Sequence, residues 1–241
     1  RSGTTLLDTI LRTHSKINVI EEQPMVIKME NAFSNTIKIS EIESIDNSMA
    51  NNLSKFYFKE LKNHINIDDK KVIIDKFPLN IIKLPLISNI FQNSKFILAL
   101  RHPFDCILSC WMQNFRLNAP MSNLLDIERI VEFYCIEMEF ISLCQKRYSL
   151  DIHKIKYENL ISNFRSEITN TLSFLKLKWE NDLINYQNTA LSRVKINTPS
   201  YSQVIKPLYS NSSYRWKNYE KYLSSFKKQL KPWIEEFNYT F

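Results

Sequence analysis

The chain has 241 residues, of which 44% are hydrophobic and 24% charged, a balance typical of a globular domain with a substantial core. It contains a single glycine, Gly3, where average usage of roughly 7% would give well over ten. This composition excludes collagen-like, glycine-rich and flexible-linker proteins. A net charge of +7 favours an anionic ligand or partner, without choosing among nucleotide, nucleic acid and membrane.

The cysteines and the apolar runs narrow the class further. The four cysteines include no C-x-x-C pair, which favours buried thiols over a zinc site or a disulfide framework. The longest apolar runs, such as Phe96–Leu100, have the length of a strand, far short of the roughly 20 residues that a membrane span needs. We therefore expect no membrane span and no metal site. The compartment stays open, although a bacterial origin would place the protein in the cytoplasm.

The spacing of apolar residues predicts helices that alternate with short strands. In chain order, the predicted elements are a helix at Thr4–Arg12, a strand at Val19–Ile20, a helix at Asn47–Ile65, a strand at Lys71–Asp75, a helix at Asn80–Phe91, a strand at Phe96–Leu100, and helices at Pro103–Phe115 and Leu124–Lys146. A strand at Ile152–Lys156 and helical segments over Asn159–Phe174 follow. Continuous apolar strands between helices imply an α/β fold with three layers, in which helices flank a central parallel sheet.

The C-terminal third has a different character. Residues Asn188–Ser213 are polar, include two prolines and show no clear period, which predicts a long loop of the kind that closes a site. Two short helices are expected after it. No repeat or linker divides the sequence, so we expect a single domain over residues 1–241.

The first candidate motif is R-S-G-T-T, at the start of the first predicted helix. A glycine and two hydroxyl residues at a helix N-terminus can present backbone N–H groups and hydroxyl donors to a phosphate. The motif has no second glycine and no lysine before its threonine, so it departs from the G-x-x-x-x-G-K-[ST] loop of ATPases and GTPases. An ordinary capped helix start is the alternative interpretation.

The second candidate motif is L-R-H-P-F-D-C-I-L-S. Arg101 ends a buried strand, which is where α/β sheets place their ligands, and Ser109 follows about two helical turns later. A guanidinium and a hydroxyl in this arrangement suit a second phosphate. The alternative is an arginine that ties down a loop and a serine that faces solvent.

The two motifs together resemble the sulfotransferases that use 3′-phosphoadenosine 5′-phosphosulfate (PAPS) as donor. The segment Tyr157–Leu160 is similar to the Y-E-x-L segment of that family. Q-V-I-K-P, which starts at Gln203, and Arg215–Trp216 are similar to stretches of protein-tyrosine sulfotransferases and of bacterial sulfotransferases fused to tetratricopeptide repeats. The resemblance extends to about Tyr219 and implies a P-loop-like fold.

The resemblance also implies which residues bind the donor. In that family the first motif holds the 5′-phosphosulfate and the second holds the 3′-phosphate. The implied donor-binding residues are Arg1, Ser2, Gly3, Thr4 and Thr5 at the 5′ end, Arg101 and Ser109 at the 3′-phosphate, Tyr157 at the nucleotide, and Arg215 at a phosphate.

The implied catalytic residues are Glu22, Lys76, Arg1 and Ser200. Glu22, the second of two adjacent glutamates, would act as the general base, and Lys76, in D-K-F-P, would contact the transferring group. Ser202 stays open as an alternative to Ser200. Without the resemblance, the two glutamates would be interpreted as favouring a helix N-terminus, and Lys76 as a surface lysine.

We therefore expect transfer of a sulfuryl group from PAPS to a hydroxyl acceptor, either a peptide tyrosine or a small molecule, without a metal and without nucleic acid as partner. A homodimer is one arrangement that the resemblance allows. Family members carry a strand just before R-S-G, so the domain is expected to be truncated at the phosphosulfate-binding loop. The alternatives are a P-loop nucleoside or small-molecule kinase, a basic module that binds nucleic acid or another polyanion, and an inactive truncated sulfotransferase.

Overall fold

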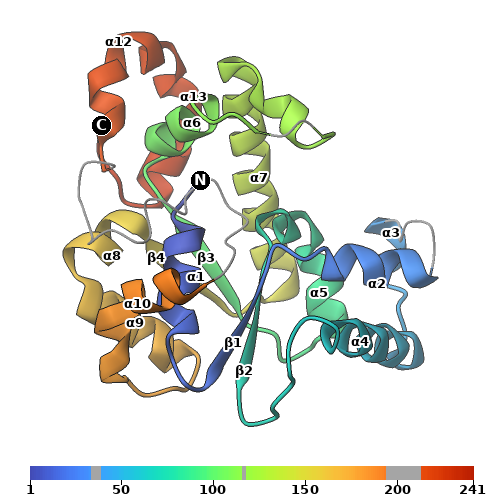
Figure 1. Cartoon of the computed structure of the whole chain (residues 1–241). Coiled ribbons are helices and arrows are strands. Elements are labelled where there is room, and N and C mark those ends of the chain that lie inside the picture. Colours follow the sequence, from blue (N-terminus) through green and yellow to red (C-terminus); the bar gives the residue numbers. More distant parts are fainter. Residues whose placement is uncertain (34–38, 116–117, 194–212) are drawn as a thin grey trace.

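The computed structural model describes residues 1–33, 39–115, 118–193 and 213–241, and it has the predicted α/β architecture (Figure 1). The strands are β1 (Ile17–Glu21), β2 (Val72–Lys76), β3 (Phe96–Leu100) and β4 (Ile152–Lys156). The longer helices are α1 (Thr4–Arg12), α2 (Met25–Phe33), α4 (Asn47–Leu61), α5 (Leu84–Ile90), α6 (Pro103–Trp111), α7 (Ile127–Tyr148), α9 (Phe164–Phe174), α10 (Tyr186–Ser192) and α13 (Lys227–Glu236). The shorter helices are α3 (Ile39–Ile42), α8 (Tyr157–Ser162) and α12 (Glu220–Leu223), and 3₁₀ turns lie at η1 (Pro78–Lys83), η2 (Met121–Leu124), η3 (Asn181–Asn185), η4 (Arg215–Tyr219) and η5 (Ser224–Phe226).

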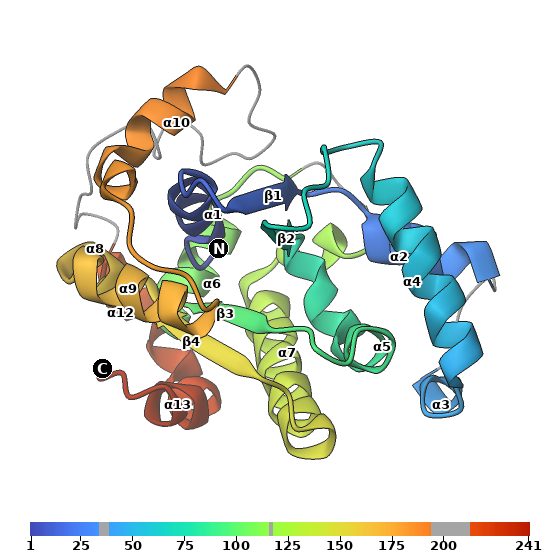
Figure 2. The same cartoon turned by 90° about the horizontal axis from the view of Figure 1, so that it is seen from below.

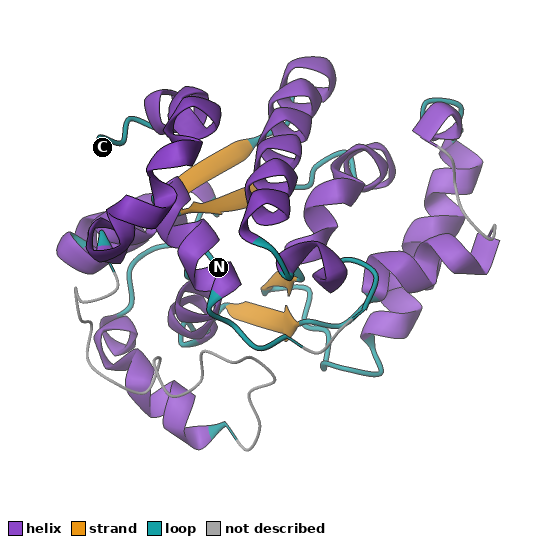
Figure 3. Cartoon of the chain, turned by 90° about the horizontal axis from the view of Figure 1, so that it is seen from above, coloured by secondary structure: helices purple, strands orange, loops and turns teal. Residues whose placement is uncertain are grey.

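The strands form two parallel pairs, β1 with β2 and β3 with β4 (Figure 3). Ile17 is opposite Val72 in the first pair, and Phe96 is opposite Ile152 in the second. Among the described residues, ladder hydrogen bonds join strands only within these pairs. The sheet is therefore open between β2 and β3.

Alternating side chains along the strands bury both faces of the sheet, as the apolar runs predict. In β3, Phe96 and Leu98 pack toward the core formed with α6, α7 and α13, whereas Ile97 and Ala99 pack toward the core formed with α1, α9 and α10. On the β1–β2 side, Ile20 packs into a third core with α2, α4 and α5. Helices thus cover the strands on both faces, and the three-layer arrangement is confirmed (Figure 2).

Most element ends differ from the prediction by a few residues, and three differences are instructive. The predicted helix Asn80–Phe91 is divided into η1 and α5, because Pro85 has no N–H to continue a helix from the preceding turn. The helix α2 was not predicted, although Met25, Val26 and Met29 form its buried face. The predicted loop Asn188–Ser213 begins inside α10, and its residues 194–212 lie outside the described residues.

Candidate active site

A cavity of about 1220 Å³ opens beside the N-terminus of α1 and extends between β2 and β3. The predicted site residues that line it are Arg1, Ser2, Gly3, Thr4, Thr5, Glu22, Lys76, Arg101, Ser109, Tyr157 and Arg215. Ser200, Ser202 and the Q-V-I-K-P segment lie outside the described residues. The fold therefore brings together candidates that are as far apart in sequence as Arg1 and Arg215.

Gly3 is the N-cap of α1 and has a φ of 84°, a left-handed conformation that glycine adopts without strain. A Cβ built on Gly3 would lie 2.6 Å from Cδ2 of Tyr157, so a side chain here would collide with the ring. In the described part of the chain, neither a capping side chain nor an acidic residue occupies the first turn of α1. The N–H groups of this helix end therefore present partial positive charge to the cavity.

Arg1 and α6 connect the two predicted phosphate motifs. Nε of Arg1 donates a hydrogen bond to Oγ of Ser109 at 3.2 Å, and Nη1 of Arg101 donates to the backbone oxygen of Arg1 at 3.3 Å. The Arg101 guanidinium also lies 5.1 Å from the centre of the Tyr157 ring. Burial lowers the pKa of Arg1, and the nearby charge of Arg101 lowers it further, against an opposing effect of Cys110. Two guanidinium groups held this close favour an anion between or beside them.

Asp105, in the second motif, holds the segment that carries Arg215. Its carboxylate accepts hydrogen bonds from the backbone N–H of Tyr214 at 2.6 Å and of Trp216 at 2.8 Å. Tyr214 has a positive φ of 56°, so the chain turns sharply just before Arg215. Burial raises the pKa of Asp105, while Arg101 and the two N–H donors oppose that rise. Asp105 thus connects the predicted 3′-phosphate motif to the predicted closing segment.

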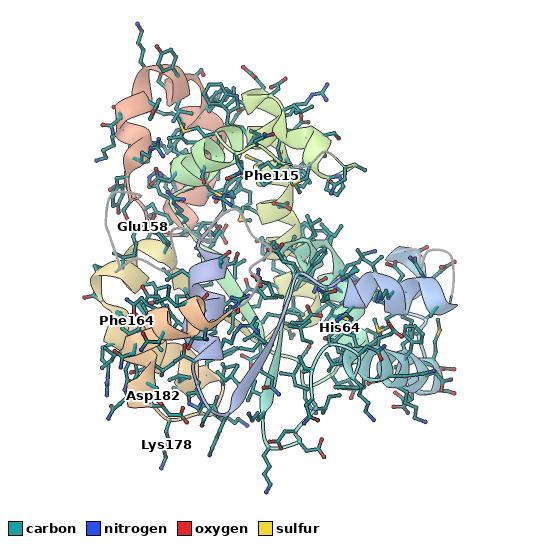
Figure 4. The ribbon with its side chains drawn as sticks, viewed as in Figure 1. His64, Phe115, Glu158, Phe164, Lys178 and Asp182 are labelled. Atoms are coloured by element: carbon teal, nitrogen blue, oxygen red, sulfur yellow. The ribbon has the colours of Figure 1, made fainter. Side chains whose placement is uncertain are left out.

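Glu158 and His102 connect the same region to the C-terminus of the chain. Glu158, labelled at the start of α8 in Figure 4, accepts hydrogen bonds from the backbone N–H of His102 and from the hydroxyl of Tyr239, both at 2.9 Å. The His102 ring stacks on Trp216 with ring centres 5.0 Å apart, and its Nε2 lies 3.0 Å from the backbone oxygen of Thr240. These residues therefore have a packing role.

Glu22 and Lys76 meet where β1 and β2 end. Nζ of Lys76 lies 2.9 Å from Oε1 of Glu22 and 3.3 Å from Oε1 of Glu21. The Lys76 side chain is only 10% exposed, so its interpretation as a surface lysine is wrong. Glu22 has a φ of 51° and donates its N–H to the backbone oxygen of Lys76, which fixes the two residues side by side.

Three charged residues around Lys76 were missed by the sequence analysis: Asp8, Glu21 and Arg193. Arg193, just after α10, forms an ion pair with Glu21, and Asp8 of α1 lies 3.9 Å from Nζ of Lys76. Asp8 could have been found from its spacing, because Arg12 follows four residues later and pairs with it at 2.9 Å. Nothing in the sequence indicates the contact of Arg193 with Glu21, since 172 residues separate them.

The structure also bears on the expected membrane spans and metal sites, for the described residues only. No described helix has both the length and the apolar character to cross a membrane. Within the same ranges, no three or more His, Cys, Asp or Glu side chains gather as metal ligands would. The four cysteines are free thiols, and two of them, Cys106 and Cys144, are buried.

The fold and the site together define an α/β protein with a cavity in which a helix N-terminus without a capping side chain lies near an acid and a lysine. The sequence model of the sulfotransferase family matches residues 1–181, and the chain belongs to that family. The fold agrees, because two solved sulfotransferase domains superpose on 90% of this chain. One, from the Synechococcus PCC 7002 olefin synthase, has a TM-score of 0.60 at 18% identity over 83% of its own length. The other, from the curacin biosynthetic pathway, has a TM-score of 0.61 at 17% identity over 87% of its own length.

Two of the curated relatives are named protein-tyrosine sulfotransferases. Protein-tyrosine sulfotransferase 2 of Gallus gallus is 23% identical over 90% of this chain and 60% of its own length, and protein-tyrosine sulfotransferase A of Caenorhabditis elegans is 20% identical over 90% and 58%. An uncharacterized protein of Aquifex aeolicus (strain VF5) is 27% identical over 98% of this chain and 33% of its own length. The chain thus spans between a third and three fifths of the length of these relatives.

Proposed function

We propose that this chain transfers the sulfuryl group of PAPS to a hydroxyl acceptor. The observation that carries the proposal is that one cavity contains both the Arg1–Ser109 contact, which joins the two predicted phosphate motifs, and the Lys76–Glu22 ion pair. Membership in the sulfotransferase family supports the reaction class. The protein-tyrosine sulfotransferases among the relatives make a peptide tyrosine the first acceptor to test.

The residues present fit such a donor. The start of α1 offers N–H groups and the hydroxyls of Thr4 and Thr5, without an acidic side chain in its described first turn to repel an anion. Arg1, Arg101 and Ser109 would meet the phosphates, and the Tyr157 ring would lie against the nucleotide. Arg215, whose neighbours Tyr214 and Trp216 are held by Asp105, would add a further positive charge to the cavity.

The chemistry needs a base and positive charge. The bound donor supplies the sulfuryl group and a phosphate leaving group. Glu22 takes the acceptor's hydroxyl proton as the new O–S bond forms. Lys76, Arg1 and Thr5 meet the negative charge that develops on the oxygen between sulfur and phosphorus, where the bond breaks and the electron pair remains. Ser200 is proposed for the same task. Positioning and charge account for the catalysis, much as in phosphoryl transfer.

The test is transfer of labelled sulfate from PAPS to tyrosine peptides, phenols and carbohydrates, with Glu22→Ala as the control. We expect transfer to at least one acceptor class and a loss of about a hundredfold or more in the variant, as removal of a general base causes. Equal activity in the variant would remove Glu22 as the base.

A thermal-shift comparison separates the sulfotransferase from a kinase. Adenosine 3′,5′-bisphosphate should raise the melting temperature, since a ligand that binds only the folded state stabilises it. Stabilisation by ATP with magnesium, but not by adenosine 3′,5′-bisphosphate, would favour the kinase. Salt-sensitive binding of nucleic acid that Arg101→Ala leaves unchanged would favour the polyanion-binding module.

A separate proposal concerns the gap between β2 and β3 and the N-terminal boundary of the domain. The cavity runs along both β2 and β3, and the lining includes apolar residues of each, such as Ile74 and Leu98. We propose that a further strand, directly before Arg1, pairs with both strands in the natural domain. Extending the chain at its N-terminus with its natural sequence should then raise the melting temperature, and an unchanged melting temperature would count against this strand.

A further inference from the structure

The Lys76 ammonium is surrounded by three carboxylates. Its Nζ lies 2.9 Å from Glu22, 3.3 Å from Glu21 and 3.9 Å from Oδ2 of Asp8. In the proposed reaction Lys76 contacts the sulfuryl donor and Glu22 contacts the hydroxyl of the acceptor. In this structure, however, the two side chains form an ion pair with each other. Lys76 must therefore exchange Glu22 for the sulfuryl donor before the base can act.

Asp8 is placed to hold Lys76 during that exchange. Its side chain is fully buried, and its Oδ1 accepts hydrogen bonds from Nε of Arg12 at 3.1 Å and from Nη2 at 2.9 Å. Its Oδ2 is buried and has no hydrogen-bond partner among the described residues. A buried carboxylate oxygen without a donor is costly, and Lys76 needs to move only about 1 Å to provide one.

When Lys76 leaves Glu22, the carboxylates of Glu21 and Asp8 remain beside it. Glu21 pairs with Arg193, and Oδ1 of Asp8 pairs with Arg12. Once Lys76 leaves Glu22, two carboxylate oxygens near its Nζ are paired with no arginine. Oε1 of Glu21 already accepts a hydrogen bond from Lys76 at 3.3 Å, whereas Oδ2 of Asp8 has no hydrogen-bond partner among the described residues and can gain one. Because α1 also carries the start of the predicted phosphate site, Asp8 fixes the lysine relative to that site.

We propose that Asp8 is a positioning residue for Lys76. The Asp8 carboxylate holds the Lys76 ammonium while Lys76 exchanges its contact with Glu22 for a contact with the donor. The exchange frees Glu22 to accept the acceptor's proton. This inference rests on the proposed sulfuryl transfer. The competing explanation is that Asp8 serves only its ion pair with Arg12 and the packing of α1.

A double-mutant cycle with Lys76 separates the two explanations. Asp8→Asn keeps the size and removes the charge, and it is made both in the natural chain and in a Lys76→Ala background. We expect kcat to fall by about tenfold in the natural chain, with the acceptor KM changed by less than about threefold, and no further fall in the Lys76→Ala background. An equal fall in both backgrounds would overturn the proposal.

Asp75→Asn is the matched control. Asp75 is a second carboxylate that lines the same cavity and is half-buried, but its Oδ2 accepts a hydrogen bond from Tyr57 instead of contacting Lys76. Its variant should leave kcat within about twofold of the natural chain. If Asp8→Asn does not fold, the variant Asp8→Asn with Arg12→Gln replaces it, because this variant removes both charges of the pair together.

A second readout does not depend on activity. An amine-reactive reagent modifies the Lys76 side chain, and mass spectrometry of the peptide that contains Lys76 measures the rate of this modification. We expect Asp8→Asn to raise this rate at least about threefold and Asp75→Asn to leave it unchanged, because only Asp8→Asn removes one of the three carboxylate charges beside the Lys76 amine. An unchanged rate together with an unchanged kcat would refute the role of Asp8. If the natural chain neither binds adenosine 3′,5′-bisphosphate nor transfers sulfate, the proposed function fails, while the modification rate still decides whether Asp8 acts on Lys76.

Discussion

Gly3→Ala tests how the phosphate-binding loop is built. The variant places a Cβ on a residue with a φ of 84°, and that Cβ would lie 2.6 Å from Cδ2 of Tyr157. The left-handed conformation costs about 1 kcal/mol for a residue with a side chain. Displacing the ring costs about 1 to 2 kcal/mol more, as overpacking typically does.

We therefore expect a loss of about 2 to 3 kcal/mol of unfolding free energy, or a melting temperature lower by about 4 to 10 °C for a chain of this length. Binding of adenosine 3′,5′-bisphosphate should weaken as well, because the displaced ring contacts Arg101. Thermal melts and titration of the bisphosphate measure the two effects.

The same change in a Tyr157→Ala background isolates the collision. There, only the backbone part of about 1 kcal/mol should remain. If Gly3→Ala is as destabilising without the ring as with it, the close contact with Tyr157 is not the reason for glycine at this position.

Three further predictions concern polar side chains that line the cavity. Asp105→Asn should weaken binding of adenosine 3′,5′-bisphosphate by about tenfold, because the charge that holds the two N–H groups beside Arg215 is lost; isothermal titration measures the affinity, and an unchanged affinity contradicts the role. Ser109→Ala should lower the same affinity by about threefold to tenfold through loss of the hydroxyl that Arg1 contacts, with the melting temperature within about 2 °C of the natural chain. Burial raises the pKa of Asp75 to about 6, so its protonated form is favoured in the folded state. The resulting stability is fully present below about pH 4 and lost as the pH rises through 6. Denaturant unfolding at several pH values should show this decline in the natural chain and its absence in Asp75→Asn.

Much of the fold could be predicted from local patterns. The helix Thr4–Arg12 and the strands Phe96–Leu100 and Ile152–Lys156 have the predicted boundaries, because apolar spacing and flanking polar residues fix such elements locally. The division of Asn80–Phe91 into two elements depends on Pro85, and the existence of α2 depends on a core that α4 and α5 complete. Local periodicity carries little information on either.

The site shows the same division between sequence and structure. The motifs led to Arg1, Ser109, Glu22 and Lys76, and all four line one cavity. Other residues that contact them, such as Asp8 near Lys76, were not visible in the motifs. Asp105 lies in the second motif, but the motif indicates no role for it. Its carboxylate accepts a hydrogen bond from the backbone N–H of Tyr214, more than a hundred residues later.

The sequence by itself indicated the class of protein, because several motifs, in their order along the chain, resemble those of the sulfotransferase family. It also marked Gly3 as exceptional, on the expectation that a phosphate approaches its backbone. The tertiary structure adds two local reasons for glycine there: a left-handed φ and the ring of Tyr157 against the Cα. Only the tertiary structure decided that Lys76 is buried among Glu22, Glu21 and Asp8. Glu21 ends β1 and Glu22 follows it, so both meet Lys76 when β1 pairs with β2, whereas Asp8 reaches Lys76 from α1. Contacts between distant segments depend on how the strands pair, and no local pattern in the sequence specifies that pairing.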